Sequence, residues 1–164
     1  MVEPQEIPIA LYIAVGRIVV NWAYVEMALN QCISVIYKRC DGKTINKSIP
    51  ASLSRKTGFL KRAFSELTML AAFALDGLAL TTRVTNIAEA RNRPTHAAFI
   101  GYDANTGSFH FRKLDHNEKT IKLIDSKRTY LQLEKNGKDI LVLAEDCARF
   151  ANKLARHFSK TARA

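Results

Sequence analysis

One long periodic segment constrains this chain more than any other feature. Between residues 8 and 39, large apolar side chains recur at alternating steps of four and three, the period of one face of an α-helix. The stripe consists of Leu11, Val15, Ile18, Trp22, Val25, Leu29, Cys32 and Ile36. It predicts an amphipathic helix from about Pro8 to Arg39 that packs on partner helices along most of its length. Gly42 is available for a left-handed cap at its end.

Two more helices with the same period are predicted before residue 93. The segment "SIPASLSRKTGFLKRAF" indicates a helix capped by Ser52 or Ser54. Its charges, Arg55, Lys56, Lys61 and Arg62, fall on or near the side opposite its apolar face, as a solvated surface would.

A third helix is predicted from about Leu70 to Asn92. Its inward register is Phe73, Gly77, Leu80, Val84 and Ile87, and the next step of four is Arg91. Pro94 disfavours helical geometry in the residue before it, so we expect this helix to stop at Asn92.

The period changes to two after His96. The segment "AAFIGYDANTGSFHFRK" predicts a β-hairpin with its turn at residues 103–107, and "TIKLID" could add a third short strand. A final helix is predicted from about Asp139 to Phe158. Residues 129–138 fit two structures, because Asn136-Gly137 is a hairpin-turn signal whereas Leu133 fits the helix register. We favour a helix from near Thr129.

These elements place the chain in the mainly α class. We expect an antiparallel bundle of about four helices, with a small β-hairpin insert before the C-terminal helix. A length of 164 residues suits a single domain over residues 1–164.

Charge and cysteine content narrow the possible environments and partners. The formal net charge of +10 favours contact with polyanions such as RNA, although a basic surface can also serve solubility alone. Three cysteines without a Cys-x-x-Cys pair indicate free thiols in a reducing cytoplasm. Arg17 and Asp76 interrupt the longest apolar runs, so we expect a cytoplasmic protein without a membrane partner.

A cluster of functional side chains stands out in "AEARNRPTHAAF", residues 88–99. The helical register points Arg91 inward, where an unpaired charge would cost several kcal/mol, so this arginine needs a carboxylate, a bound anion or a water-filled cleft. An arginine fork binds phosphate, a histidine exchanges protons near neutral pH, and an asparagine orients by hydrogen bonds. Arg91, Asn92 and His96 therefore have the functions that metal-independent RNA cleavage requires. Glu26, on the first helix, is a candidate carboxylate partner for Arg91.

The pattern Arg91-Asn92-x-x-x-His96 at the end of a bundle helix resembles the Arg-polar-x3–5-His motif of the HEPN superfamily (higher eukaryote and prokaryote nucleotide-binding domains). The segments "NWAYVEMALN" and "PASLSRK", residues 50–56, are similar to the opening of such domains. The resemblance implies a metal-independent endoribonuclease of toxin–antitoxin or phage-defence type, working as a homodimer, with a possible antitoxin protein as partner. It also implies that Arg91 contacts the scissile phosphate, that His96 transfers protons, and that Asn92 orients the phosphate or the histidine.

Three other features of the chain have residues typical of binding sites. The C-terminal helix carries a basic stripe that could follow an RNA backbone or simply be solvated, formed by Arg149, Lys153, Arg156 and Lys160. Phe109 and Phe111 could stack on bases or cover the bundle. His110 and His116 lack a carboxylate at ligand spacing, so we expect no metal, and no motif indicates a cofactor.

Two alternatives to an enzyme remain open at this point. The same fold could be a non-catalytic module that binds RNA, a nucleotide or a protein. It could also be a purely structural bundle in which Arg91 anchors an internal salt bridge.

Overall fold

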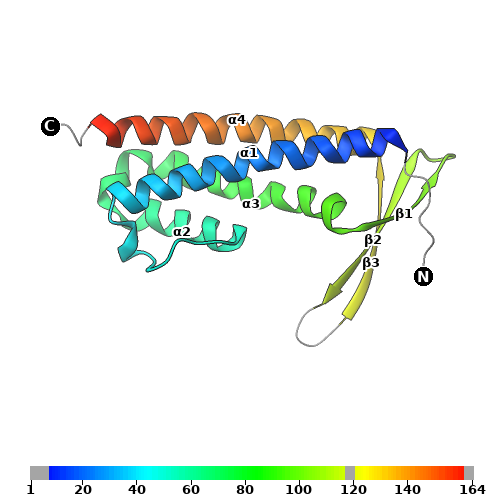
Figure 1. The fold of residues 1–164 in the computed structure, drawn as a ribbon, viewed down its shortest axis with the longest axis horizontal. Helices are drawn as coiled ribbons and strands as arrows, with labels where there is room; N and C mark the ends of the chain where they lie inside the picture. The colour runs from blue at the N-terminus through cyan, green and yellow to red at the C-terminus, as the bar shows by residue number, and fades with distance from the viewer. Residues whose placement is uncertain (1–7, 117–120, 161–164) are drawn as a thin grey trace. The chain divides into compact units, whose positions relative to one another are not determined.

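The computed structural model describes residues 8–116 and 121–160, which are mainly helical with a small three-stranded antiparallel sheet (Figure 1). The elements are α1 (Ile9–Arg39), η1 (Gly42–Thr44), α2 (Leu53–Glu66), η2 (Thr68–Phe73), α3 (Ala74–His96), β1 (Ala98–Asp103), β2 (Ser108–His116), β3 (Ile121–Thr129) and α4 (Tyr130–Lys160). Two compact units share the three long helices. One contains residues 1–21 and 88–140, and the other contains residues 22–87 and 141–164.

The unit of residues 22–87 and 141–164 has an all-helical core. The predicted inward positions of α1 and α3 in this unit are buried except Ile87, which is half-buried, and α2 and α4 contribute to the same core. The fully buried side chains include Val25, Ile36, Leu60, Val84, Leu143 and Leu154. Phe64 of α2 meets Phe150 of α4 edge to face, with ring centroids 5.6 Å apart. Gly77 of α3 leaves room for that ring, because a Cβ there would lie 2.7 Å from Phe64 ring atoms.

The end of α1 differs from the prediction in one residue. Asp41, and not Gly42, has the left-handed backbone, with φ 54°. Gly42 is required for another reason, since a Cβ there would lie 3.0 Å from Cγ2 and from the backbone oxygen of Ile36. Aspartate tolerates the left-handed region better than most residues. In this turn, Asp41 therefore adopts the left-handed backbone, and Gly42 provides the space beside Ile36.

Lys56 corrects the prediction that all four α2 charges are solvated. Its side chain is only 10% exposed, and its Nζ lies 3.9 Å from Oε2 of Glu26. Trp22 Nε1 donates a hydrogen bond to Oε1 of the same carboxylate, at 2.8 Å. Glu26 therefore joins α1 to α2 through the buried cation of Lys56, while the indole of Trp22 holds the same carboxylate from within α1.

We expect Glu26→Ala to cost more stability than Lys56→Met. The alanine leaves the buried ammonium of Lys56 and the indole N–H of Trp22 without their acceptor, at a cost of about 1–2 kcal/mol. Lys56→Met removes the buried charge but keeps the packing, and Glu26 is still partly solvated, so its cost should stay below about 1 kcal/mol. Urea unfolding of both variants measures the difference. Equal costs would contradict this account of the pair.

The three cysteines are buried free thiols. Burial raises the pKa of Cys32 and of Cys147 from 9.0 to about 12, and that of Cys40 to about 11. Because the thiolate is the reactive form, we expect no labelling by a thiol reagent at pH 8 in the folded protein and three labelled thiols in denaturant. The unfolded thiols ionise near pH 9 and the folded ones later, so stability should fall as pH rises above 9. Rapid labelling of the folded protein would contradict this burial.

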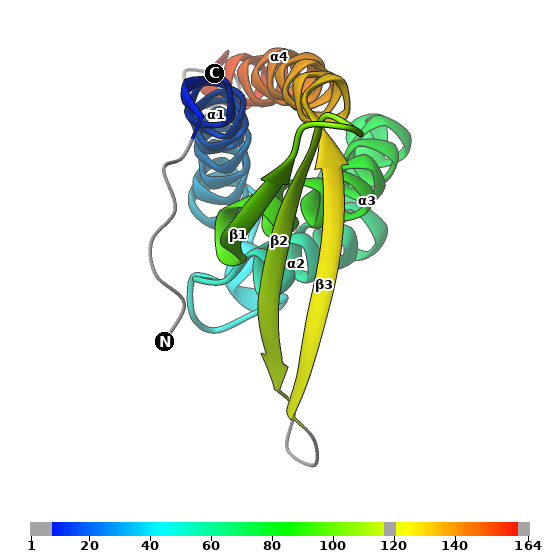
Figure 2. The same ribbon diagram turned by 90° about the vertical axis from the view of Figure 1, so that its right-hand side faces the viewer.

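The sheet belongs to the unit of residues 1–21 and 88–140. Its order is β1-β2-β3, with β2 antiparallel to both neighbours (Figure 2). The predicted turn at residues 103–107 is confirmed. Oδ1 of Asp103 accepts a hydrogen bond from the backbone N–H of Asn105 at 3.0 Å, and Gly107 has φ 62°. The insert is a three-stranded sheet and not a hairpin alone, because "IKLID", residues 121–125, begins the nine-residue strand β3, the third strand that the sequence allowed.

The segment 130–138 forms the start of α4, as we favoured, and not a hairpin. Gly137 is buried there, and the position of its missing Cβ lies 3.7 Å from Cβ of Arg17 and 3.9 Å from Cγ1 of Ile18. Asn21 Nδ2 donates to the Gly137 carbonyl at 2.9 Å. This glycine therefore permits close packing of α4 on α1 and does not mark a turn.

The third helix does not stop at Asn92. α3 continues through Pro94 to His96. A proline in the last turn removes one donor and leaves the following turn intact, and Pro94 is itself buried. Thr95 Oγ1 donates to the Arg91 carbonyl at 2.8 Å within this turn. The expected break is therefore absent, and this decides where His96 lies.

Among the described residues, α1 is the one single helix that by length and composition could cross a bilayer, even though it contains Arg17. α2 and the bent segment after it meet the same criterion only together, with an angle of 107° between them. Arg17 therefore does not by itself make this apolar segment too short to cross a bilayer.

Candidate functional site

The end of α3 brings three predicted site residues together. Arg91 Nη1 lies 2.9 Å from Oδ1 of Asn92, to which it donates, and 2.7 Å from Nε2 of His96. Asn92 and His96 are four residues apart and so share a face of the helix. The guanidinium of Arg91 reaches across the turn to both, and it does so because the helix continues past Pro94.

The contact between Arg91 and His96 is a hydrogen bond in one tautomer of the imidazole. A guanidinium N–H can only donate, so Nε2 of His96 must be the acceptor and its proton must be on Nδ1. A lone pair on Nε2 is also what a general base needs to take a proton from a hydroxyl group.

Exposure differs among the three side chains in a way that suits a binding site. His96 is exposed, whereas Arg91 and Asn92 are half-buried, and Nε of Arg91 is enclosed. A buried guanidinium stem with an accessible imidazole can hold a phosphate and leave the proton-transfer group open to substrate. A histidine buried away from solvent would have excluded the enzyme hypothesis, and His96 is not buried.

Glu26, the predicted carboxylate partner of Arg91, has contacts of its own. Its two oxygens are engaged by Trp22 and Lys56. These contacts explain its position on α1 without a role in catalysis. Its pairing with Arg91 stays a prediction.

The basic stripe of α4 is partly neutralised by acidic neighbours. Arg149 contacts Asp146, and Lys153 Nζ lies 3.4 Å from Oδ2 of Asp76. Arg83, 2.8 Å from Asp146, helps to lower the pKa of that carboxyl below its ordinary value. Arg156 is exposed, and the side chain of Lys160 lies outside the described residues. RNA binding by this stripe stays a prediction that rests mainly on Arg156.

The aromatic residues of β2 are not available to bases. Phe109 and Phe111 are buried, and both rings contact Phe99 of β1, with centroids 6.4 and 6.3 Å away. They cover the interior, which was the second interpretation of their pattern. Among the described residues, no group of three His, Cys, Asp or Glu side chains could hold a metal ion.

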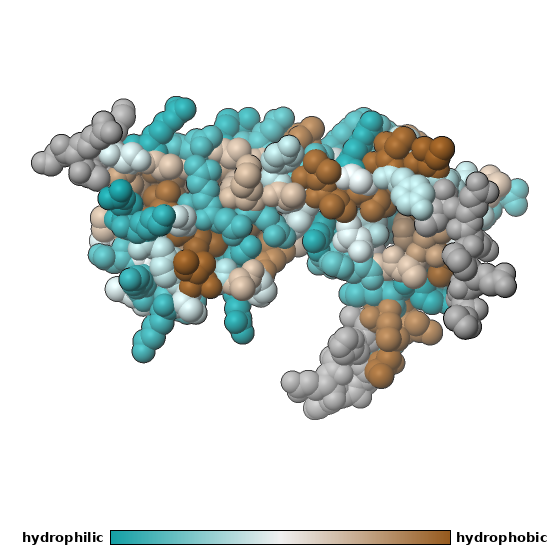
Figure 3. All heavy atoms as spheres, viewed as in Figure 1, coloured by the Kyte–Doolittle hydropathy of each residue, from teal (hydrophilic) through white to brown (hydrophobic). Residues whose placement is uncertain are grey.

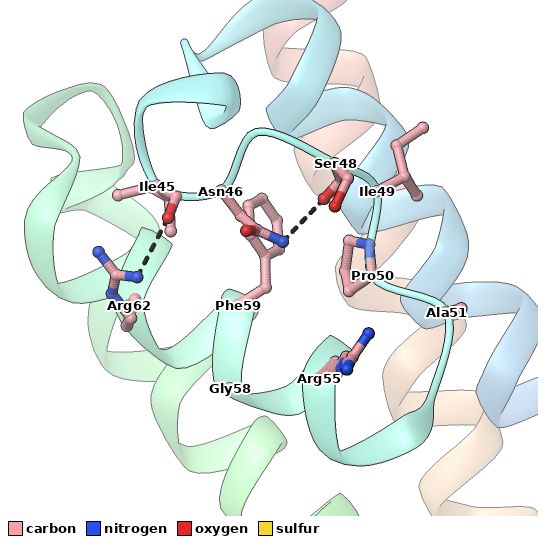
Figure 4. Close-up of a pocket in the computed structure, with 10 residues that line it drawn as sticks. All are labelled: Ile45, Asn46, Ser48, Ile49, Pro50, Ala51, Arg55, Gly58, Phe59 and Arg62. Carbon is pink, nitrogen blue, oxygen red and sulfur yellow. Dashed lines mark hydrogen bonds between the residues drawn. The ribbon is translucent and has the colours of Figure 1, made fainter.

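A pocket beside α2 was not predicted from the sequence. It has a volume of about 360 Å³ and lies between α2 and the loop of residues 45–51 (Figure 4). Pro50 and Phe59 supply buried apolar walls, while Arg55 and Arg62 come from one side of α2, seven residues apart. Arg62 is tied back by a hydrogen bond from Nη1 to the Ile45 carbonyl at 3.1 Å. Arg55 is exposed at the pocket.

The spacing of Arg55, Gly58 and Arg62 could have indicated this pocket, because steps of three and four place them on one face of a helix. Gly58 leaves that face open, with no other atom within 4 Å of its Cβ position. The opposite wall comes from a loop without periodicity, and its proximity to α2 has no signal in the sequence. Comparisons with protein-family models, curated proteins and solved structures give no significant match to this chain.

Proposed function

We propose that this chain is a HEPN-like protein that acts on RNA as a metal-independent endoribonuclease and works as a homodimer. The proposal includes the finer fold, an antiparallel four-helix bundle of that superfamily. Its support is the convergence of Arg91, Asn92 and His96 within hydrogen-bond distance at one helix end. The pattern of these residues was the basis of the resemblance, and their geometry suits its chemistry.

In the proposed reaction, Nε2 of His96 takes the proton of a ribose 2′-hydroxyl, and the 2′-oxygen attacks the adjacent phosphorus. The bond from phosphorus to the 5′-oxygen breaks, leaving a 2′,3′-cyclic phosphate and a 5′-hydroxyl. Arg91 stabilises the charge on the phosphorane, and Asn92 holds the guanidinium in place. The departing 5′-oxygen takes a proton from a second His96, which must enter the reaction as the imidazolium, in a symmetric dimer.

In the proposed enzyme, the contact from Arg91 to His96 would be the resting state of the site before RNA binds. The arginine occupies the lone pair that the base must use. A bound phosphate is a stronger acceptor for a guanidinium than a neutral imidazole is. RNA binding would therefore draw Arg91 onto the phosphate and release His96 for proton transfer.

The experiment that tests this function is the analysis of RNA ends after incubation in excess EDTA. We expect cleavage with 2′,3′-cyclic phosphate and 5′-hydroxyl ends, since no metal takes part. Cleavage only with added divalent cations, or products with 5′-phosphates, would contradict the mechanism. A cytoplasmic location, a role in a toxin–antitoxin or phage-defence system and an antitoxin partner belong to the same proposal. Growth arrest on expression, relieved in the His96→Ala variant, would support them.

A second candidate function is non-catalytic binding of RNA or a nucleotide, and the pocket beside α2 favours it. Arg55 could take a phosphate while Pro50 and Phe59 contact an apolar ring face. This function predicts RNA affinity that falls with salt, survives His96→Ala and is lost in Arg55→Ala. Lys61→Ala, which removes a charge from α2 outside the pocket, is the matched control.

A further inference from the structure

α1 has a second apolar stripe that the core does not use. Its positions alternate steps of four and three along one exposed side of the helix, as in a coiled-coil seam; they are Ile9, Ile13, Gly16, Val20, Ala23 and Met27. The four large members are between 45% and 77% exposed. We call these six residues the outer seam of α1. The opposite side of the same helix supplies core residues such as Ile18 and Val25, both fully buried.

The surroundings of the outer seam are apolar as well. Tyr12, Val19 and Tyr24 flank it, each about half exposed. Between residues 9 and 29 only Arg17 and Glu26 are charged, and Arg17 lies 3.7 Å from Glu134 of α4. Hydrophobic residues gather over the first half of α1 on the face shown in Figure 3. A contiguous exposed stripe of this kind marks an interaction surface.

The outer seam is complementary to itself in one orientation. When two such helices run antiparallel about a two-fold axis near residue 18, Ile9 of one copy faces Met27 of the other. Ile13 then faces Ala23, and Gly16 faces Val20, so each small residue of the seam meets a large one. The Cβ position of Gly16 has no other atom within 4 Å, which leaves room for Val20 of a second copy. A parallel pair would set glycine against glycine and alanine against alanine, leaving voids.

The exposed apolar area suits a second copy of this chain. The seam and its flanks carry seven large apolar residues that are each 45–77% exposed, a contiguous patch on the order of several hundred Å². A standard interface buries about 800 Å² per partner. A bilayer surface fits less well, because helices that lie on membranes carry lysines and arginines beside the apolar face. Here tyrosines and a valine occupy those positions.

We propose that two copies of this chain pair through the outer seam of α1, antiparallel, with the two-fold axis crossing the seam at the level of residue 18. The proposed function uses a homodimer without assigning its surface. This pairing rests on the residues of α1 alone and does not depend on RNA cleavage.

Sedimentation equilibrium without RNA tests the pairing. We expect a dimer for the wild type, and on the order of 100-fold weaker association for Val20→Glu, which would bury an unpaired charge in the seam. Ser65→Glu, which adds the same charge at an exposed position of α2, is the control and should leave the dimer intact. A wild-type monomer, with or without binding to anionic vesicles, would overturn the proposal, as would a dimer that Val20→Glu leaves unchanged.

Disulfide formation tests the register independently. The Ile13→Cys, Ala23→Cys double variant should form covalent dimers under mild oxidation, whereas either single variant should not. The native cysteines are buried and should not interfere. Covalent dimers from a single variant would overturn the antiparallel register.

Discussion

His96→Ala should lower RNA cleavage in EDTA on the order of 10²–10⁴-fold, the usual contribution of a positioned acid–base group. Arg91→Lys should also lose most activity, because an ammonium keeps the charge but cannot contact phosphate in two places or hold Asn92 and His96 together. Asn92→Ala should lose roughly tenfold, the equivalent of one hydrogen bond. Single-turnover rates at saturating enzyme measure all three effects on the chemical step.

Two controls separate catalysis from stability and from charge. Lys135→Ala removes an exposed charge from the same unit as the site and should leave cleavage within about twofold of the wild type. Thermal unfolding of the Arg91 variant distinguishes an active-site residue from a structural anchor. If Arg91→Ala lowers stability by about 3 kcal/mol or more, the structural hypothesis holds and the site hypothesis loses its support.

Gly77→Ala and Gly58→Ala should change stability in opposite directions. An alanine in a helix interior is normally favoured over glycine by about 1 kcal/mol. Gly58 is exposed in α2 with no other atom within 4 Å of its Cβ position, so Gly58→Ala should stabilise by about that amount. At Gly77 the new methyl would lie 2.7 Å from the buried ring of Phe64. We expect a net cost of about 1–3 kcal/mol there, so the two variants should differ by about 2–4 kcal/mol in denaturant unfolding.

A double-mutant cycle with Phe64→Leu identifies the cause of the Gly77 effect. A smaller side chain at position 64 should relieve the clash, so that Gly77→Ala becomes neutral or stabilising in that background. A cost that is the same in both backgrounds would show that the Phe64 ring is not the obstacle.

The helices were predictable where the apolar period is long. The stripe from Leu11 to Ile36 needs no tertiary information, and α1 begins at Ile9 and ends at Arg39, close to the predicted ends. Local sequence signals were ambiguous where a tertiary contact determines the structure. Asn136-Gly137 reads as a turn, but Gly137 is the position where α4 comes close to Arg17 and Ile18 of α1. A turn signal depends only on residues adjacent in the sequence, so it carries no information on a contact with a distant helix.

The residues of the candidate site could be predicted from the sequence, but their arrangement in space could not. The expected break at Asn92 would have left the position of His96 undefined, whereas a continuous helix places its imidazole 2.7 Å from Arg91. The prediction that Lys56 is solvated was wrong, because periodicity gives the side of the helix on which a side chain lies but not which other elements cover it. Its burial depends on Glu26, thirty positions earlier in the chain. The pocket at Arg55 was missed because one of its walls is an irregular loop.

The measurement that tests the central claim most directly is RNA cleavage in excess EDTA by the wild type beside the Arg91→Ala, His96→Ala double variant. The account predicts cleavage by the wild type alone, and none when the ribose at the cleavage site lacks its 2′-hydroxyl. Equal cleavage by both proteins would place the activity elsewhere. No cleavage by either protein on a broad set of RNAs would contradict the enzyme and favour the binding module.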